Sequence, residues 1–152
     1  MTDGITSQPL RQRAINAALG NIPFDRLLIN ARVIDMVTGE IREADVGITG
    51  NMIASVHSRG KFTQTENVDD LSGNYLSPGL IDTHVHIESS HLPPEKYAEI
   101  VVAQGTTTVF WDPHELANVL GVAGVQYAIQ SSRNLPLRVI CAAPSSVPST
   151  PG

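Results

Sequence analysis

The sequence predicts an α/β fold in which a small antiparallel sheet is followed by parallel β/α units. Short runs of strand-forming residues, separated by turns that contain Gly, fill the region 24–75. From residue 80 onward the pattern becomes strand, helix, strand, helix, strand, and strands joined through helices run parallel. With 152 residues, 41% of them hydrophobic and 16% charged, the chain is expected to be globular.

The amino-terminal region predicts one helix and several short strands. Ser7 can cap a helix with a Pro in its first turn, and Gly20 follows the last apolar residue of that helix. The strand-forming runs lie at residues 26–30, 31–37, 44–49, 52–57 and 67–71. Gly50-Asn51 between two of these runs is a signal for a tight hairpin. His57 ends a predicted strand without a partner at the spacing of metal ligands, so we expect it at the surface.

The carboxyl-terminal region predicts three strands that alternate with two helices. The strands are predicted at residues 80–87, 106–111 and 137–143, and the helices at 95–104 and 116–132. The run 106–111 is rich in β-branched and aromatic residues, which favours a buried strand. Gly121 and Gly124 weaken the second helix. Its expected inward residues are Leu120, Val125 and Ile129.

His84 and His86 lie two residues apart in the first of these strands, so both imidazoles should leave the same face. Neutral imidazole is the commonest side-chain metal ligand, although two polar residues on a solvated strand are the alternative. Polar side chains also follow the next two strands, namely Asp112, His114 and Glu115, and then Ser145 and Ser146. Ligands bind where the carboxyl ends of parallel strands converge. We therefore expect a metal site that includes both histidines.

The composition argues against several classes of function. A net charge of −5 and scattered Lys and Arg argue against partners such as nucleic acids or anionic membranes. Cys141 is the single cysteine, which excludes an intramolecular disulfide and fits a reducing compartment. No stretch has the length of a transmembrane helix, and the first 20 residues lack the apolar run of a secretory signal. A cytoplasmic protein is expected.

One run, PGLIDTHVH at residues 78–86, resembles the first barrel strand of the amidohydrolase superfamily, whose members open with P-G-x-I-D-x-H-x-H. Further runs resemble the adenine deaminases of that superfamily. They are DMVTGE (35–40), IESS (87–90), GTTTV (105–109), DPHELANVLG (112–121) and APSSVP (143–148). The resemblance covers nearly the whole chain.

The resemblance implies a small β-sandwich, assembled from both ends of a chain, and a TIM-like (β/α)8 barrel with a binuclear centre of manganese, iron or zinc. Residues 1–23 would form an amino-terminal helix, residues 24–78 the amino-terminal part of the sandwich, and residues 79–152 the first three β/α units of the barrel. The implied reaction is the hydrolytic deamination of adenine to hypoxanthine and ammonia by a metal-activated hydroxide.

The same resemblance implies roles for particular residues. By position, His84 and His86 resemble the first pair of metal ligands. Candidate catalytic residues without an assigned role are Glu88, Asp112, His114 and Glu115. The Glu88 carboxylate is expected to contact either the substrate or a metal ligand. The alternative is a solvated acid in a loop. Asp112, which precedes a Pro, is alternatively only a turn residue and a helix cap.

A whole (β/α)8 barrel takes about 250 residues, so the sequence is expected to be the amino-terminal portion of such an enzyme. We expect little or no activity from this portion alone. An unpaired strand edge and an uncovered sheet face favour association with a second copy or with a complementing carboxyl-terminal portion. The alternatives are another amidohydrolase that cleaves cyclic amides, and a non-catalytic metal-binding or association fragment.

Overall fold

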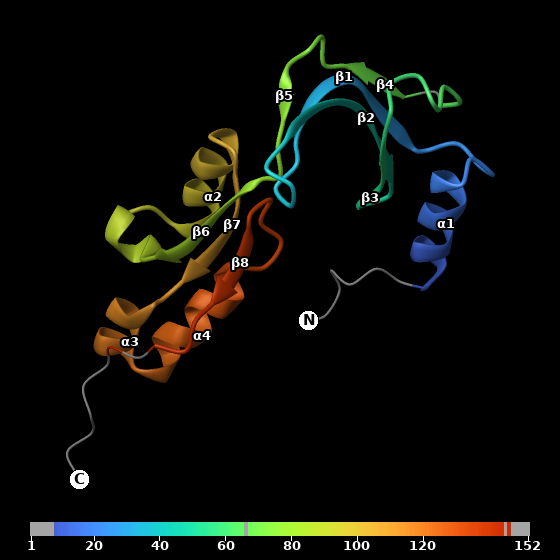
Figure 1. The fold of residues 1–152 in the computed structure, drawn as a ribbon. Coiled ribbons are helices and arrows are strands. Elements are labelled where there is room, and N and C mark those ends of the chain that lie inside the picture. Colours follow the sequence, from blue (N-terminus) through green and yellow to red (C-terminus); the bar gives the residue numbers. More distant parts are fainter. Residues whose placement is uncertain (1–7, 66, 145, 147–152) are drawn as a thin grey trace. The chain divides into compact units, whose positions relative to one another are not determined.

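The computed structural model describes residues 8–65, 67–144 and 146, and the chain divides into two compact units (Figure 1). We call Met1–Pro78 the amino-terminal unit and Gly79–Gly152 the carboxyl-terminal unit. Both units combine a β-sheet with α-helical structure. The predicted α/β class is therefore confirmed. None of the described helices is both long and apolar enough to cross a membrane.

The amino-terminal unit contains a mixed sheet. Its elements are α1 (Gln8–Ala18), β1 (Arg26–Ile34), β2 (Ile41–Thr49), β3 (Met52–His57), β4 (Val68–Asp70) and β5 (Tyr75–Leu76). The strand order is β3-β2-β1-β4, and β5 also pairs with β1. Strands β1, β2 and β3 pair antiparallel, as predicted, whereas β4 and β5 run parallel to β1. The sheet is therefore not wholly antiparallel, because the chain returns to β1 through longer connections.

Strand β1 is continuous where the sequence predicts two strands, at residues 26–30 and 31–37. The register of the β1–β2 pair shifts at a β-bulge around Asn30, whose φ of 58° is left-handed. The Asn30 N–H donates to a carboxylate oxygen of Asp45 on β2 at 3.0 Å. The bulge bends the strand without ending it, and the sequence pattern does not distinguish this from a turn.

The predicted two-residue hairpin joins β2 to β3. Gly50 has a φ of 58°, which a residue without Cβ adopts without strain. The Gly50 N–H donates to the carboxylate of Asp25 at 2.7 Å, and the Arg13 guanidinium on α1 donates to the same group. The bond from Gly50 is the main reason why the pKa of Asp25 lies below its usual value. One carboxylate therefore joins the helix to the hairpin.

The core of the amino-terminal unit is small and aromatic. Ala17, Phe24 and Leu27 are each at most 4% exposed. The His57 ring stacks on Phe24 with centroids 5.9 Å apart and meets Phe62 edge-on at 4.7 Å. His57 is only 8% exposed, so the expectation of a surface position is wrong. Phe24 precedes β1 and is distant from His57 in the sequence, so no local pattern connects the two rings.

Acid is expected to destabilise the amino-terminal unit through His57. Burial lowers the pKa of His57 below its usual value, while Asp45 opposes this effect and Lys61 adds to it. The unfolded chain then binds the proton more readily than the folded one, so stability is present above about pH 6.5 and is lost as the pH falls through the lowered pKa. Urea denaturation at a series of pH values should show a smaller loss for a His57→Phe variant. Equal pH dependence in the two proteins would contradict this expectation.

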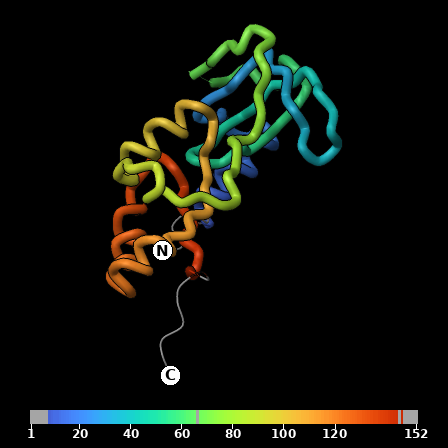
Figure 2. The backbone as a smooth tube through the Cα atoms, turned by 90° about the vertical axis from the view of Figure 1, so that its left-hand side faces the viewer, coloured from blue at the N-terminus to red at the C-terminus, as the bar shows by residue number. Residues whose placement is uncertain are grey.

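The carboxyl-terminal unit alternates strands and helices. Its elements are β6 (Leu80–Val85), the 3-10 helix η1 (Ile87–Ser90), α2 (Pro94–Ala103), β7 (Thr106–Trp111), α3 (His114–Leu120), α4 (Val122–Ser131) and β8 (Arg138–Cys141). The strands pair in the order β6-β7-β8, and both pairs are parallel, as predicted. Figure 2 follows this alternation along the backbone, from yellow-green at β6 to red at β8.

Helices α2 and α4 cover one face of this parallel sheet. Val109 and Trp111 of β7 are at most 1% exposed and pack with small residues of α2 and α4. Val85 at the end of β6 joins the same core. Because side chains alternate across a strand, the residues next to Val85, His84 and His86, point away from this core.

Several elements of this unit differ in extent from the prediction, including the third strand, which is shorter at Arg138–Cys141 than the predicted 137–143. The strand predicted at residues 80–87 ends at Val85, so His86 lies just beyond it, before η1 begins. The helix predicted at residues 116–132 is two helices, because Gly121 has a φ of 60° and a ψ of −140°, which no α-helix accommodates.

The inward residues of the helical pair also differ from the prediction. Gly124 and Ala128 are buried and Val125 is half-buried, whereas Leu120 and Ile129 are 55% and 46% exposed. A Cβ added at Gly124 would lie 2.4 Å from the carbonyl oxygen of Leu116 on α3. The close contact between the two helices therefore admits small residues where the periodic pattern favours large ones.

Candidate metal centre

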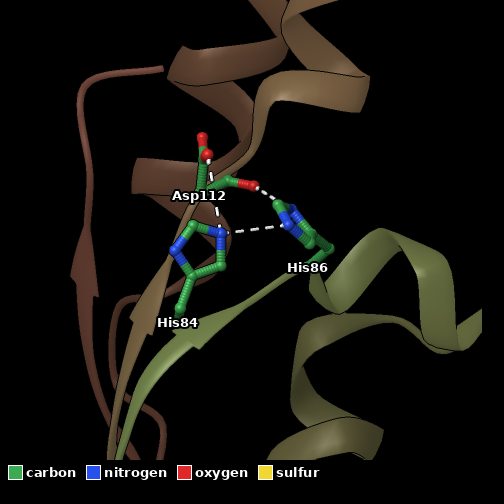
Figure 3. Close-up of side chains that lie close together, drawn as sticks. All are labelled: His84, His86 and Asp112. Atoms are coloured by element: carbon green, nitrogen blue, oxygen red, sulfur yellow. Dashed lines mark hydrogen bonds and ion pairs between the residues drawn. The ribbon is translucent and has the colours of Figure 1, made fainter. Parts of the chain in front are cut away.

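Three side chains with metal-binding atoms converge at the carboxyl ends of β6 and β7. His84 lies near the end of β6, His86 directly follows that strand, and Asp112 directly follows β7. Figure 3 shows the two imidazoles and Asp112 gathered around a common point. One donor atom from each of the three residues lies within 4.8 Å of the others. We call these three residues the metal cluster.

The distances suit atoms that share one ion. His84 Nε2 lies 3.1 Å from His86 Nε2 and 3.9 Å from Asp112 Oδ2. Two nitrogens that bind one Zn²⁺ at about 2.0–2.1 Å with a tetrahedral angle lie roughly 3.3 Å apart. The two imidazoles therefore need little rearrangement to bind the same ion.

The backbone of Asp112 fixes the ring of His86. His86 Nδ1 lies 2.8 Å from the Asp112 carbonyl oxygen, and because a carbonyl oxygen only accepts, Nδ1 carries the proton. In the neutral ring Nε2 then keeps its lone pair, which is the form that binds a metal. The Asp112 N–H donates to the carbonyl oxygen of Val85 at 3.0 Å. The backbone thus sets both the tautomer and the orientation of His86.

The carboxylate of Asp112 is buried, and among the described residues it forms no ion pair with a Lys or Arg side chain. Asp112 is 6% exposed, and its Oδ1 has no hydrogen-bond partner within the described part of the chain. The nitrogens that approach its Oδ2 belong to His84, at 3.9 Å, and His114, at 3.4 Å. A buried carboxylate is costly unless a cation compensates it. Two imidazole nitrogens and one carboxylate oxygen suit zinc, iron or manganese, so the residues fit a divalent metal.

Two of the residues predicted to follow β7 lie at the cluster. Asp112 belongs to it, and Pro113 occupies the cap position of α3 without a side-chain capping bond, so Asp112 is not merely a helix cap. His114 packs edge-on against His86, with ring centroids 4.6 Å apart. His114 therefore restricts the position of one ligand candidate.

Glu88 and Glu115 have partners outside the cluster. Glu88 is half-buried and accepts a hydrogen bond from the indole N–H of Trp111, so it is not a freely solvated acid. The carboxylate oxygens of Glu115 accept from the Ser89 hydroxyl at 2.8 and 2.9 Å. The sequence patterns assign no role to Trp111 or Ser89. Only their positions point to them: Trp111 ends a predicted buried strand, and Ser89 lies inside the IESS run.

Cys141 behaves as a packing residue. It is half-buried, and burial raises the pKa of its thiol, against a smaller opposing effect of its contact with Ser132. A raised pKa keeps the thiol protonated at neutral pH, whereas nucleophilic cysteines react as thiolates. The site chemistry therefore does not involve this thiol.

Comparison with known proteins points to one family. The sequence model of the Amidohydrolase family matches residues 75–151. The chain is 72% identical over all of its 152 residues to an adenine deaminase of Serratia proteamaculans (strain 568), of which it covers 26%. It is 70% identical over 143 residues, 94% of the chain, to an adenine deaminase of Klebsiella pneumoniae (strain 342), of which it covers 24%. The chain thus spans about a quarter of the length of these relatives.

Solved structures agree with this result. D-aminoacylase superposes with a TM-score of 0.64 and 26% identity, over 82% of this chain and 30% of that enzyme. A study of the same enzyme concerns its binuclear metal centre. The L-hydantoinase of Arthrobacter aurescens superposes with a TM-score of 0.64 and 22% identity, over 78% of this chain and 27% of that protein, and so shares the fold. Because the family model covers half of the sequence and the metal cluster lies within it, the chain belongs to the amidohydrolase family.

Proposed function

We propose that the chain provides the first metal-binding strands of an enzyme that converts adenine and water into hypoxanthine and ammonia. The proposal rests on the convergence of His84, His86 and Asp112 in a chain that is 72% identical to an adenine deaminase along its whole length. Because the chain corresponds to 26% of that relative, the activity is proposed for an assembly that also contains the remaining portion.

A divalent metal, manganese, iron or zinc, would be held by His84 Nε2, His86 Nε2 and the carboxylate of Asp112. Its contribution would be Lewis acidity, which would lower the pKa of a bound water toward neutrality. Three protein donors with an open position suit one catalytic ion. The binuclear centre of D-aminoacylase supports a second ion, which would need donors beyond these three.

The residues of this chain would prepare the site rather than complete it. The Asp112 carbonyl oxygen holds the proton on His86 Nδ1, so Nε2 faces the cluster as an acceptor. The His114 ring limits rotation of His86. The hydrolysis replaces the amino group of adenine by oxygen and releases ammonia, so its proton transfers need further groups.

A chimera tests this function directly. This chain would replace the matching 152 residues of the Serratia adenine deaminase, and hypoxanthine formation from adenine would be measured with manganese, iron or zinc. The chimera should deaminate adenine, whereas its His84→Ala and His86→Ala variants should lose bound metal and turnover together. Normal metal content in both variants would show that neither histidine binds the metal.

A cyclic amide hydrolase is the second candidate, because the hydantoinase fold matches this chain. Turnover of hydantoin by the chimera, with none of adenine, would favour it. Metal binding by the chain, with neither reaction in the chimera, would favour a non-catalytic module. A cytoplasmic location, and association with a second copy or with a complementing portion, stay predictions.

A further inference from the structure

Two segments that follow the strands of the metal cluster are joined by side-chain contacts. The first is η1, which begins directly after His86. The second runs from Asp112 into the first turn of α3. Backbone contacts of Asp112 with His86 and Val85 link the two strand ends. Two further links come from the predicted catalytic residues Glu88 and Glu115.

The first of these links joins η1 to α3. The Ser89 hydroxyl lies 2.8 Å from Oε1 and 2.9 Å from Oε2 of Glu115, so its one proton is shared between both oxygens. Both residues are exposed. A single hydrogen bond between exposed groups adds little to the free energy of unfolding, because water competes for both groups. Any strong effect of this contact must therefore come from geometry and not from stability.

The second link joins η1 to β7. Glu88 accepts from the indole N–H of Trp111, a side chain that is 1% exposed and fixed in the core. Only Ile87, itself 1% exposed, separates Glu88 from His86. Holding Glu88 therefore holds the backbone just beyond a ligand candidate.

The third residue of the same run shapes the turn itself. The Ser90 hydroxyl donates to the carbonyl oxygen of Ile87 at 2.6 Å, and its oxygen accepts from the Leu92 N–H at 3.2 Å. Each residue of the Glu88-Ser89-Ser90 run thus has its own contact. The run and the DPHE loop at residues 112–115 are two halves of one network around the metal cluster.

We propose that Glu88 and Glu115 are positioning residues, which lock η1 against Trp111 and α3 and so hold His86 and Asp112 at metal-binding separation. The inference rests on the proposed metal site. It assigns to these carboxylates no contact with adenine or with the reacting atoms.

Cobalt binding by the chain tests this proposal, because Co²⁺ has a visible spectrum that reports its ligand geometry. Glu115→Ala and Ser89→Ala should each weaken Co²⁺ binding about 10- to 100-fold, the usual effect of losing a residue that orients a ligand. Both should also change the spectrum. Glu115→Gln should behave like the unaltered chain, since its amide oxygen still accepts the Ser89 hydroxyl. Glu88→Ala should likewise weaken Co²⁺ binding, whereas Glu88→Gln should bind Co²⁺ like the unaltered chain.

Glu95→Ala on the exposed surface of α2 is the matched control, and it should leave cobalt affinity and spectrum unchanged. Urea midpoints should agree among the Ser89 and Glu115 variants. Unaltered affinity and spectrum in Glu115→Ala would refute the positioning role alone. A loss in Glu115→Ala without a loss in Ser89→Ala would also refute it, because Glu115 would then act directly on the ion. If the unaltered chain binds no Co²⁺, the metal site itself is wrong, and the positioning role falls with it.

Discussion

Replacement of Asp45 by Ala is expected to lower the free energy of unfolding of the amino-terminal unit by about 3 kcal/mol or more. Asp45 is 2% exposed, and its two carboxylate oxygens accept from the N–H groups of Asn30 at 3.0 Å and Gly60 at 2.7 Å. Hydrogen bonds to a charged group contribute about 1.5–3 kcal/mol each, and removing the acceptor leaves both donors without it. The loss should be large because one side chain holds both the bulge of β1 and the turn after β3.

Urea denaturation followed by circular dichroism measures this loss. Amide exchange should accelerate most at Asn30 and Gly60. Asp69→Ala is the control, since Asp69 is a half-exposed carboxylate that pairs with the exposed Arg26 at 3.1 Å, and such surface pairs contribute about 0–1 kcal/mol. Trp111, the single tryptophan, lies in the other unit and should keep its fluorescence. A loss no larger than that of Asp69→Ala would show that Asp45 is not the anchor of the sheet.

Local patterns predicted the elements whose character lies within a few residues. The strand at Thr106–Trp111 has the predicted limits, because β-branched residues favour an extended backbone wherever they pack. The Gly50 hairpin follows from the one residue type that its turn requires. Alternation placed His84 and His86 on one side of the chain, even though β6 ends between them.

The features that local sequence patterns do not predict depend on contacts between residues that are distant in the sequence or on different elements. The position of His57 depends on its stacking with Phe24, which precedes β1 and which no local signal connects to it. Both Gly121 and Gly124 weaken a helix, but only Gly121 breaks it, while Gly124 permits the approach of α3. The same reason explains why sequence alone left the role of Asp112 open.

The candidate site likewise combines a feature that local sequence patterns predict with features that depend on long-range contacts. Its histidine pair follows from spacing on one strand, whereas the third donor comes from the end of the neighbouring strand. The partners of Glu88 and Glu115 likewise belong to other elements. Residue types therefore suggested a metal site, and the parallel pairing of β6 with β7 determined which carboxylate joins it.

Replacement of His86 by Ala is expected to weaken Mn²⁺ or Zn²⁺ binding by the chain more than about 100-fold, beyond the usual loss for a residue that only orients a ligand. The variant removes one donor nitrogen and also the Nδ1–H that bonds to the Asp112 carbonyl oxygen at 2.8 Å. Only two of the three donors of the metal cluster then remain, His84 and Asp112, which lie 3.9 Å apart.

Isothermal titration with each metal measures the effect, and His91→Asn is its matched control. His91 is an exposed histidine of the same unit with a φ of 58°, a conformation that Asn tolerates well. That variant should keep the affinity of the unaltered chain, because His91 lies outside the metal cluster. Equal losses in the two variants would mean that the metal binds histidines without regard to geometry. An unchanged affinity in His86→Ala would instead remove His86 from the donor set and leave its contact with Asp112 as a structural one.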